Sequence, residues 1–173
     1  MQSDRPLVLI ADDERNAVVL LTRILERDGF AVESAKDGET ALQKAKELHP
    51  DLILMDVQMP RMNGFEVTQQ LRENPDTARI PVIFVTAAAR EPSDVAHGFR
   101  LGADDYIRKP YNYHELLARA HSKMRARQLE DRLQRRSEEL EALVLIGGEF
   151  NQRLGLSELT ELILVIASQE LSA

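Results

Sequence analysis

A set of polar side chains follows short apolar runs, at positions from which they could act on one substrate together. Asp12 and Asp13 come directly after the first apolar run, Asp56 follows the third, Thr86 ends the fourth, and Lys109 lies just beyond the fifth. In an open parallel α/β sheet, reacting groups gather at the carboxyl ends of the strands. If the strands follow the usual doubly wound order, these side chains therefore converge on one crevice.

The residue types indicate phosphoryl transfer to a carboxylate. Carboxylates that crowd together repel one another unless a cation lies between them, and Mg²⁺ is a hard ion that takes carboxylate and phosphate oxygens as ligands. The adjacent Asp12 and Asp13 suit a metal, whereas Asp56 stands alone at its strand end and is the expected nucleophile. Lys109 would give a positive charge, and Thr86 a hydrogen bond, to a phosphoryl oxygen.

Each of these residues also has an ordinary structural explanation. An Asp after a strand commonly caps the next helix, Thr86 could do the same, and Lys109 could be a surface charge. The presence of the whole set at successive strand ends is what favours a functional site.

The elements that must position these residues are visible as short apolar runs that alternate with amphipathic stretches up to about residue 110. This alternation predicts repeated βα units around a parallel sheet. Three runs are apolar throughout, as strands covered by helices on both faces require, while the second and fifth are typical of more peripheral strands. The predicted strands are 7–11, 30–34, 52–55, 82–85 and 103–107.

The composition excludes several classes of protein. The chain has 173 residues, of which 43% are hydrophobic and 29% charged, enough for one ordinary core. Its 22 Lys+Arg and 29 Asp+Glu give a net charge of -7, which argues against direct binding of nucleic acid. It has no cysteine and no apolar run near the roughly 20 residues of a membrane span, so we expect a cytoplasmic protein with no membrane partner.

The chain from Tyr113 to Phe150 has no proline and predicts one long helix. From Ala126, apolar residues alternate at three and four positions, with a polar break at Arg136 and a glycine pair at 147–148 that would weaken the seam locally. A solvated helix packed on its own domain is the alternative. The pattern predicts a parallel coiled coil, and hence a homodimer, through Leu129, Leu133, Leu140, Leu143 and Phe150.

Four stretches together resemble the receiver domain of two-component response regulators, the CheY-like domain. They are 7–14 (LVLIADDE), 54–66 (LMDVQMPRMNGFE), 81–87 (PVIFVTA) and 102–110 (GADDYIRKP), and the resemblance covers about residues 5–124. It implies a flavodoxin-like (βα)5 fold, which is a doubly wound parallel α/β sheet. It also implies a regulatory phosphoacceptor domain rather than an enzyme.

The same resemblance implies that a partner histidine kinase or phosphotransfer protein phosphorylates Asp56. It implies that Mg²⁺ is bound by Asp13 and Asp56, by Asp12 through water, and by the backbone carbonyl of Gln58.

The resemblance further implies a switch beside the phosphorylation site. Thr86, Ala87 and Lys109 would contact the phosphoryl group, and Lys109–Pro110 would be a cis peptide. Tyr106 would turn inward when Thr86 moves toward the phosphoryl group; a purely structural Tyr106 is the alternative.

We therefore expect a receiver domain over 1–124, a coiled-coil signalling helix over 125–154 and the start of an output domain over 155–173. Residues 143–154 and 156–163 resemble the linker helix and first helix of a GAF-type domain, which suggests a truncated output. The expected function is a phosphorelay response regulator in which Asp56 switches a dimeric coiled coil that controls this output.

Two other functions stay open from the sequence. One is a magnesium-dependent phosphohydrolase with an aspartyl-phosphate intermediate, which would need a second carboxylate where Gln58 stands. The other is a stand-alone receiver that acts by docking a protein partner.

Overall fold

The computed structural model describes residues 5–87, 96 and 98–153, and from residue 147 it describes the backbone alone. Strands and helices alternate along this part of the chain. The elements are β1 (Leu7–Ala11), α1 (Arg15–Arg27), β2 (Ala31–Ala35), α2 (Gly38–Leu48), β3 (Leu52–Met55), α3 (Gly64–Glu73), β4 (Val82–Thr86), β5 (Asp105–Arg108) and α5 (Tyr113–Arg153).

The five strands form one sheet in the order β2-β1-β3-β4-β5. Every neighbouring pair is parallel. The chain leaves β1 toward β2 on one side and then returns to β3 on the other side, so the strand order reverses between β1 and β3. The loops that follow these two strands therefore border the crevice in which this class of fold binds its ligands.

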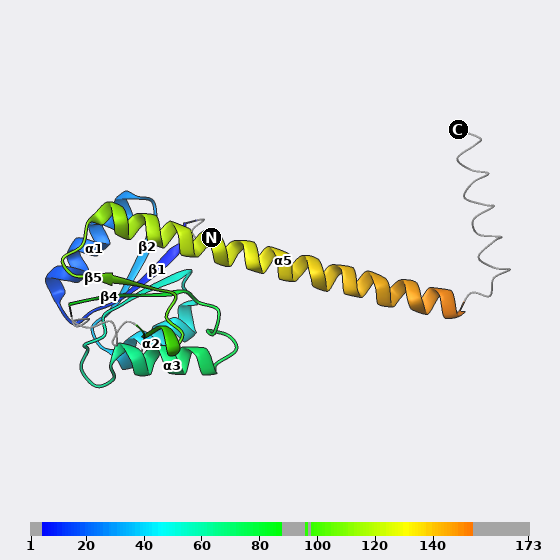
Figure 1. Ribbon diagram of the computed structural model, residues 1–173, viewed down its shortest axis with the longest axis horizontal. Coiled ribbons are helices and arrows are strands. Elements are labelled where there is room, and N and C mark those ends of the chain that lie inside the picture. Colours follow the sequence, from blue (N-terminus) through cyan, green and yellow to red (C-terminus); the bar gives the residue numbers. More distant parts are fainter. Residues whose placement is uncertain (1–4, 88–95, 97, 154–173) are drawn as a thin grey trace. The chain divides into compact units, whose positions relative to one another are not determined.

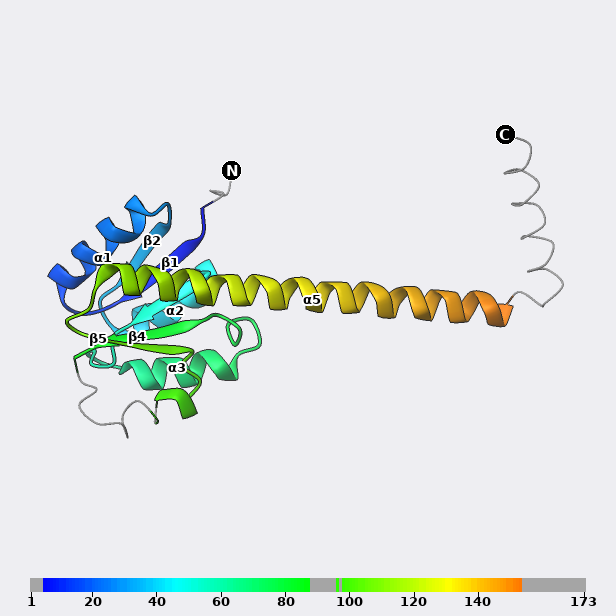
Figure 2. The same ribbon diagram turned by 45° about the horizontal axis from the view of Figure 1, so that its top comes forward.

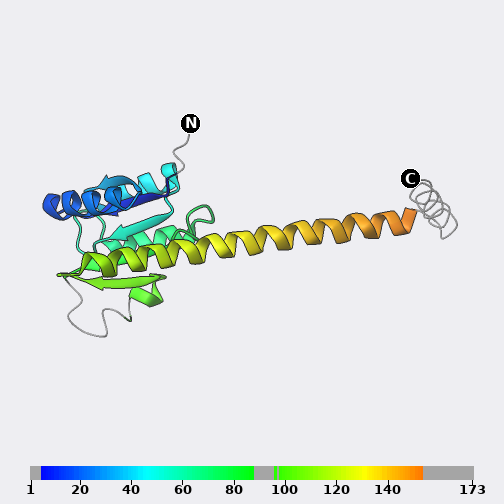
Figure 3. The same ribbon diagram turned by 90° about the horizontal axis from the view of Figure 1, so that it is seen from above.

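Helices cover both faces of the sheet, as the apolar runs predicted. α2 and α3 lie on one face, while α1 and the first turns of α5 lie on the other (Figure 1). Figure 2 shows the same layers after a 45° turn, and Figure 3 looks onto the side of α1 and α5. Phe84, Leu9 and Leu71 belong to the core under α2 and α3, and Ile10, Leu21 and Leu116 to the core under α1 and α5.

The predicted strands are confirmed, with small shifts at the two edges of the sheet. β1, β3 and β4 are buried along almost their whole length, whereas the edge strands β2 and β5 are partly exposed. β2 begins one residue later than predicted, because the N–H of Phe30 donates to the Leu25 carbonyl and so belongs to the end of α1. β5 begins at Asp105, because the N–H of Ala103 still bonds to the Gly98 carbonyl.

The predicted long helix is also present, and it continues through the glycine pair 147–148 to Arg153. The chain divides into two compact units, Met1–Gln128 and Leu129–Ala173. In the first unit, the α5 side chains of Leu116, Ala120 and Met124 are buried against the sheet. In the second, the predicted seam residues Leu129, Leu133, Leu140 and Leu143 are 53% to 64% exposed.

Two predictions for the second unit stay untested. The side chain of Phe150 and the expected output segment 155–173 lie outside the described residues. Among the helices that the structure describes, none combines the length and apolar character needed to cross a membrane.

Candidate functional site

Three carboxylates meet at the reversal of strand order. Asp12 and Asp13 follow β1, and Asp56 follows β3. One oxygen from each of the three lies within 4.8 Å of the others. Asp12 is buried and the Asp56 side chain is 11% exposed, whereas Asp13 faces solvent. The expected strand order predicted that these three carboxylates lie close together, and in the structure they do.

Lys109 connects two of these carboxylates. Its Nζ donates to Asp12 Oδ2 at 2.6 Å and to Asp56 Oδ2 at 2.9 Å. Burial disfavours the charge on Lys109, but the two carboxylates outweigh it and raise the pKa of Lys109 to about 12. The ammonium group is therefore charged at neutral pH and lies against Asp56, the predicted nucleophile.

Asp12 is the most buried carboxylate of the cluster. Burial raises the pKa of Asp12, against hydrogen bonds from Lys109 Nζ and the Glu14 N–H, and the neighbouring Asp56 charge raises it further. A cation bound between the carboxylates would relieve both the desolvation and the repulsion. The electrostatics of the site thus favour a bound cation.

The backbone around Asp56 is closely constrained. The Asp56 N–H donates to the Ala11 carbonyl at 2.7 Å, which fixes β3 beside β1, and the Gln58 N–H donates to Asp56 Oδ1 at 3.2 Å. The chain then returns over the strand end, where a Cβ on Gly64 would lie 2.3 Å from the Asp56 carbonyl oxygen. A side chain at position 64 would displace this backbone, so the close approach requires glycine.

The fourth and fifth strands supply the remaining predicted residues. Thr86 is buried at the end of β4, and its carbonyl accepts the Lys109 N–H at 3.0 Å, which joins the ends of β4 and β5. Ala87 follows in an exposed position. The Lys109–Pro110 peptide is cis, the geometry that the resemblance implied. Tyr106 is half-buried, with its ring 5.9 Å from that of Phe84.

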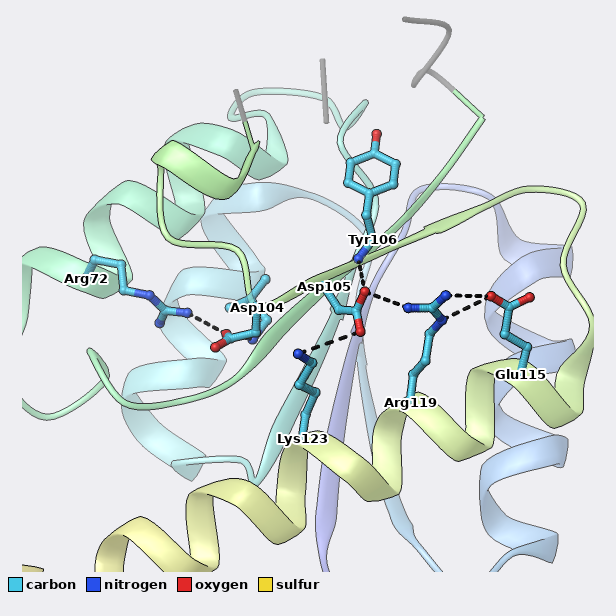
Figure 4. A network of polar contacts seen from close by, with 8 residues as sticks. Arg72, Asp104, Asp105, Tyr106, Glu115, Arg119 and Lys123 are labelled. Atoms are coloured by element: carbon cyan, nitrogen blue, oxygen red, sulfur yellow. Dashed lines mark hydrogen bonds and ion pairs between the residues drawn. The ribbon is translucent and has the colours of Figure 1, made fainter. Parts of the chain in front are cut away.

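Two adjacent aspartates at the start of β5 hold the strand between helices on opposite faces (Figure 4). Asp104 accepts from Arg72 of α3 at 2.9 Å. Asp105 accepts from Arg119 of α5 at 2.8 Å and pairs with Lys123 at 3.7 Å. The Tyr106 N–H also donates to Asp105, so the backbone of Tyr106 is tied to the residues that bind α5.

The donor set fits a hard divalent cation. The clustered groups are carboxylate oxygens, which Mg²⁺ prefers, and the exposed Asp13 leaves one side open to water and phosphate oxygens. Asp12, Asp13 and Asp56 could hold such an ion.

Comparison with known proteins identifies the family. Residues 8–121 match the response regulator receiver domain. The chain belongs to this family. Receiver domains generally bind Mg²⁺ at an acidic pocket, and the aspartate cluster of this chain corresponds in chemistry to such a pocket.

Two solved structures show how closely the fold agrees. The receiver resembles the chemotaxis protein CheY4 of Vibrio cholerae with a TM-score of 0.64 and 31% identity, over 68% of this chain and 98% of that one. It resembles the response regulator domain of Thermotoga maritima CheB with a TM-score of 0.63 and 32% identity, over 70% and 97% of the two chains. These similarities confirm the predicted CheY-like α/β fold.

Curated relatives are longer than this chain. It is 39% identical over 141 residues to the alkaline phosphatase synthesis transcriptional regulatory protein PhoP of Bacillus subtilis, covering 81% of this chain and 58% of PhoP. It is 41% identical over 120 residues to the DNA-binding dual master transcriptional regulator RpaA of Synechocystis, covering 69% and 49%. The chain thus spans about half the length of these relatives.

The names of these relatives bear on two expectations. Both are transcriptional regulators rather than enzymes, which agrees with the regulatory role expected of a receiver. RpaA is named as DNA-binding, whereas the acidic composition of this chain predicts no direct nucleic-acid partner. That expectation stays a prediction for this chain.

The sequence did not predict the ion pairs that lie around the site. Arg72, Asp105 with Arg119, and the pair of Arg61 with Asp37 join segments far apart in the chain. For Asp37 a signal existed, because an Asp-Gly pair directly before an amphipathic stretch is typical of a helix N-cap. Nothing in the local sequence indicates the long-range partner of any of these residues.

Proposed function

We propose that this receiver is the phosphoacceptor of a phosphorelay. Asp56 takes a phosphoryl group from a histidine kinase or phosphotransfer protein, with Mg²⁺ at the aspartate cluster. The observation that supports this most strongly is the position of Lys109 Nζ, shared between Asp12 and Asp56 at 2.6 and 2.9 Å beside the exposed Asp13. A nucleophile, a cation for phosphoryl oxygens and a metal-ligand set thus occupy one site.

The proposed step is an in-line displacement at phosphorus. An Asp56 carboxylate oxygen forms the new O–P bond, while the N–P bond of the donor phosphohistidine breaks and its electron pair stays on the leaving imidazole. Lys109 stabilises charge on the phosphoryl oxygens through its Nζ. Mg²⁺ held by Asp13 and Asp56, by Asp12 through water and by the Gln58 carbonyl would lower the repulsion between the carboxylate and the incoming group.

We further propose that phosphorylation is transmitted through Thr86 and Tyr106 to α5. A phosphoryl group adds negative charge next to the end of β4, where Thr86 is buried and linked by its carbonyl to Lys109. Movement of Thr86 would open space for the half-buried Tyr106 ring. The backbone of Tyr106 is tied to Asp105, and Asp105 binds Arg119 and Lys123, so α5 is next in this chain of contacts.

The output is proposed to be a parallel coiled-coil homodimer of the signalling helix, 125–154, leading into an output domain from residue 155. Support comes from the exposed leucines at 129, 133, 140 and 143, whose spacing matches a heptad seam. Burial of a leucine contributes about 1.5–3 kcal/mol. Four such residues in each helix would give a strong tendency to pair.

Phosphoryl uptake tests the proposal directly. The full chain is incubated with a small acyl phosphate donor and Mg²⁺, and the modified residue is located by mass spectrometry after reductive trapping. We expect modification at Asp56, sensitive to hydroxylamine, and none in Asp56→Asn. Equal modification of Asp56→Asn, or trapping at Asp12 or Asp13, would contradict the assignment.

The alternatives predict different results in simple assays. A phosphohydrolase would turn over external phosphate esters, yet position 58, two residues after Asp56, is a glutamine whose N–H bonds to Asp56. We expect slow loss of the group from Asp56 and no ester turnover. A stand-alone docking receiver would stay monomeric in solution at every concentration tested.

A further inference from the structure

The β3–α3 loop, residues 57–63, follows directly on Asp56 and contains Gln58. Its two ends are fixed: the Gln58 N–H bonds to Asp56 Oδ1, and the Gly64 N–H donates to the Val57 carbonyl at 2.9 Å. The middle of the loop is held by a side chain. Arg61 leaves the loop and pairs through Nη2 with Asp37 Oδ2, at the start of α2.

Asp37 is an unusual partner because it is 1% exposed. Its Oδ1 accepts the Thr40 N–H at 2.8 Å and so caps α2, while Oδ2 faces Arg61. A buried carboxylate is costly unless a cation and hydrogen bonds satisfy it. Arg61 Nη1 also lies 3.4 Å from Glu39 Oε2, so one guanidinium contacts both the N-cap residue of α2 and an acid in its first turn.

The backbone conformation of the loop also indicates that contacts with neighbouring segments determine its position. Arg61 has φ 68, in the left-handed region that a residue with a Cβ rarely adopts. Next to it, the Met62 carbonyl lies so close to α2 that a Cβ on Gly38 would be 2.1 Å from its oxygen. Such a conformation persists where surrounding contacts determine it. The Arg61–Asp37 pair is a contact of that kind.

We propose that Arg61 is a positioning residue for the cation site. Through Asp37, it fixes the β3–α3 loop at the height at which the Gln58 carbonyl can join Asp13 and Asp56 as a ligand. This inference rests on the proposed function, because it concerns the Mg²⁺ of that site. Arg61 contacts neither the carboxylate cluster nor the reacting oxygen, so its effect would pass through the loop.

Mg²⁺ affinity of the whole chain, measured by isothermal titration calorimetry with magnesium chloride, tests the proposal. Arg61→Gly is the main variant, because glycine accepts the left-handed φ, so the change removes the contacts of Arg61 with Asp37 and Glu39 without straining the backbone. Asp37→Asn removes the same pair while keeping a good N-cap for α2. Removal of an outer partner of a metal site commonly weakens affinity about 10- to 100-fold, and we expect about tenfold weaker binding in both variants.

The two variants separate positioning from long-range charge. Arg61→Gly removes a positive charge, which by itself would strengthen cation binding, whereas Asp37→Asn removes a negative charge, which would weaken it. Weaker binding in both variants is therefore a result that charge alone does not give. Arg61→Lys should recover part of the affinity. Glu33→Gln, which breaks the exposed 2.8 Å pair between Glu33 of β2 and Lys44 of α2, is the matched control and should bind as the wild type does.

A second measurement distinguishes a positioning role from general damage. At saturating Mg²⁺, phosphoryl uptake by Arg61→Gly should proceed at the wild-type rate, with all titrations made at a temperature at which circular dichroism shows each variant folded. Wild-type Mg²⁺ affinity in Arg61→Gly would overturn this inference and leave the proposed function intact. A wild-type chain that binds no Mg²⁺ would overturn both.

Discussion

The aspartate–lysine site and the second unit of the chain differ in how far a single chain provides contacts for their side chains. At the site, the ammonium of Lys109 lies between the carboxylates of Asp12 and Asp56. In the second unit, the large apolar side chains from 129 to 146 are more than half exposed. Charges can be balanced by a few well-placed groups, but apolar surface is removed from water by another apolar surface.

This difference distinguishes the proposed phosphoacceptor site from the proposed output helix. The groups that would accept a phosphoryl group are assembled within Met1–Gln128. The stretch that would deliver the response carries Leu129, Leu133, Leu140 and Leu143 without burying them. In the unphosphorylated chain, substitutions at the site should therefore alter stability and metal binding, and substitutions in the seam should alter association.

The largest expected effect is on association. Leu133→Asp combined with Leu140→Asp should weaken dimerisation by at least about ten-thousandfold, because the two chains together lose four buried leucines, which contribute at least about 6 kcal/mol. Sedimentation equilibrium measures this. Gln128→Asp with Gln134→Asp adds the same charge outside the seam and should leave the dimer unchanged. Unchanged association of the leucine variant would contradict the proposed coiled coil.

The next largest effect is at the site. Lys109→Met leaves the buried Asp12 and Asp56 without their cation and should lower the free energy of unfolding by about 3 kcal/mol in the absence of Mg²⁺. Denaturant unfolding measures this, and added Mg²⁺ should restore most of the loss. Lys123→Met is the control, since its partner Asp105 keeps Arg119. Equal stability of Lys109→Met and the wild type would show that the carboxylates are satisfied in another way.

A smaller loss is expected at Arg72, which joins α3 to the start of β5 (Figure 4). Its guanidinium donates to the carbonyls of Ala78, Ile80 and Gly102 as well as to Asp104. Arg72→Ala leaves these groups without that donor and should cost about 2 kcal/mol of stability. Gln69→Ala, on the exposed side of α3, should cost less than 0.5 kcal/mol. An equally small loss in Arg72→Ala would show that these carbonyls and Asp104 are satisfied without the guanidinium.

The smallest effect is a pH dependence. The pKa of Lys109 is raised to about 12 from 10.5, so its stabilising effect is complete below the unfolded value and is lost as pH rises through the folded one. The stability difference between wild type and Lys109→Met should shrink by roughly 1 kcal/mol between about pH 10.5 and pH 12. Denaturant midpoints along this series measure it. A constant difference would show that the charge of Lys109 contributes nothing.

Much of the fold follows from local sequence patterns. The runs at 7–11, 52–55 and 82–85 are apolar throughout because helices cover both faces of these strands, and they form β1, β3 and β4. The convergence of Asp12, Asp13 and Asp56 then follows from the strand order. The predicted starts of the edge strands β2 and β5 are less accurate, because the residues before them still bond to the preceding turns.

The ion pairs around the site could not be predicted from local sequence patterns. Arg61 and Asp37 are 24 positions apart, and Arg72 and Asp104 are 32 apart. Their pairing depends on how loops pack after the sheet has formed, which no periodicity encodes. The left-handed backbone of Arg61 is likewise a product of its neighbours rather than of its own preference.

In the proposed mechanism, the phosphorylation site controls the exposed seam. Its most direct test is the dimer affinity of the full chain, measured with and without beryllofluoride and Mg²⁺, for the wild type and for Asp56→Asn. We expect the phosphoryl analogue to change dimer affinity and helix order in the wild type and to leave Asp56→Asn unaffected. The same dimer affinity and helix order in both proteins under all conditions would contradict it.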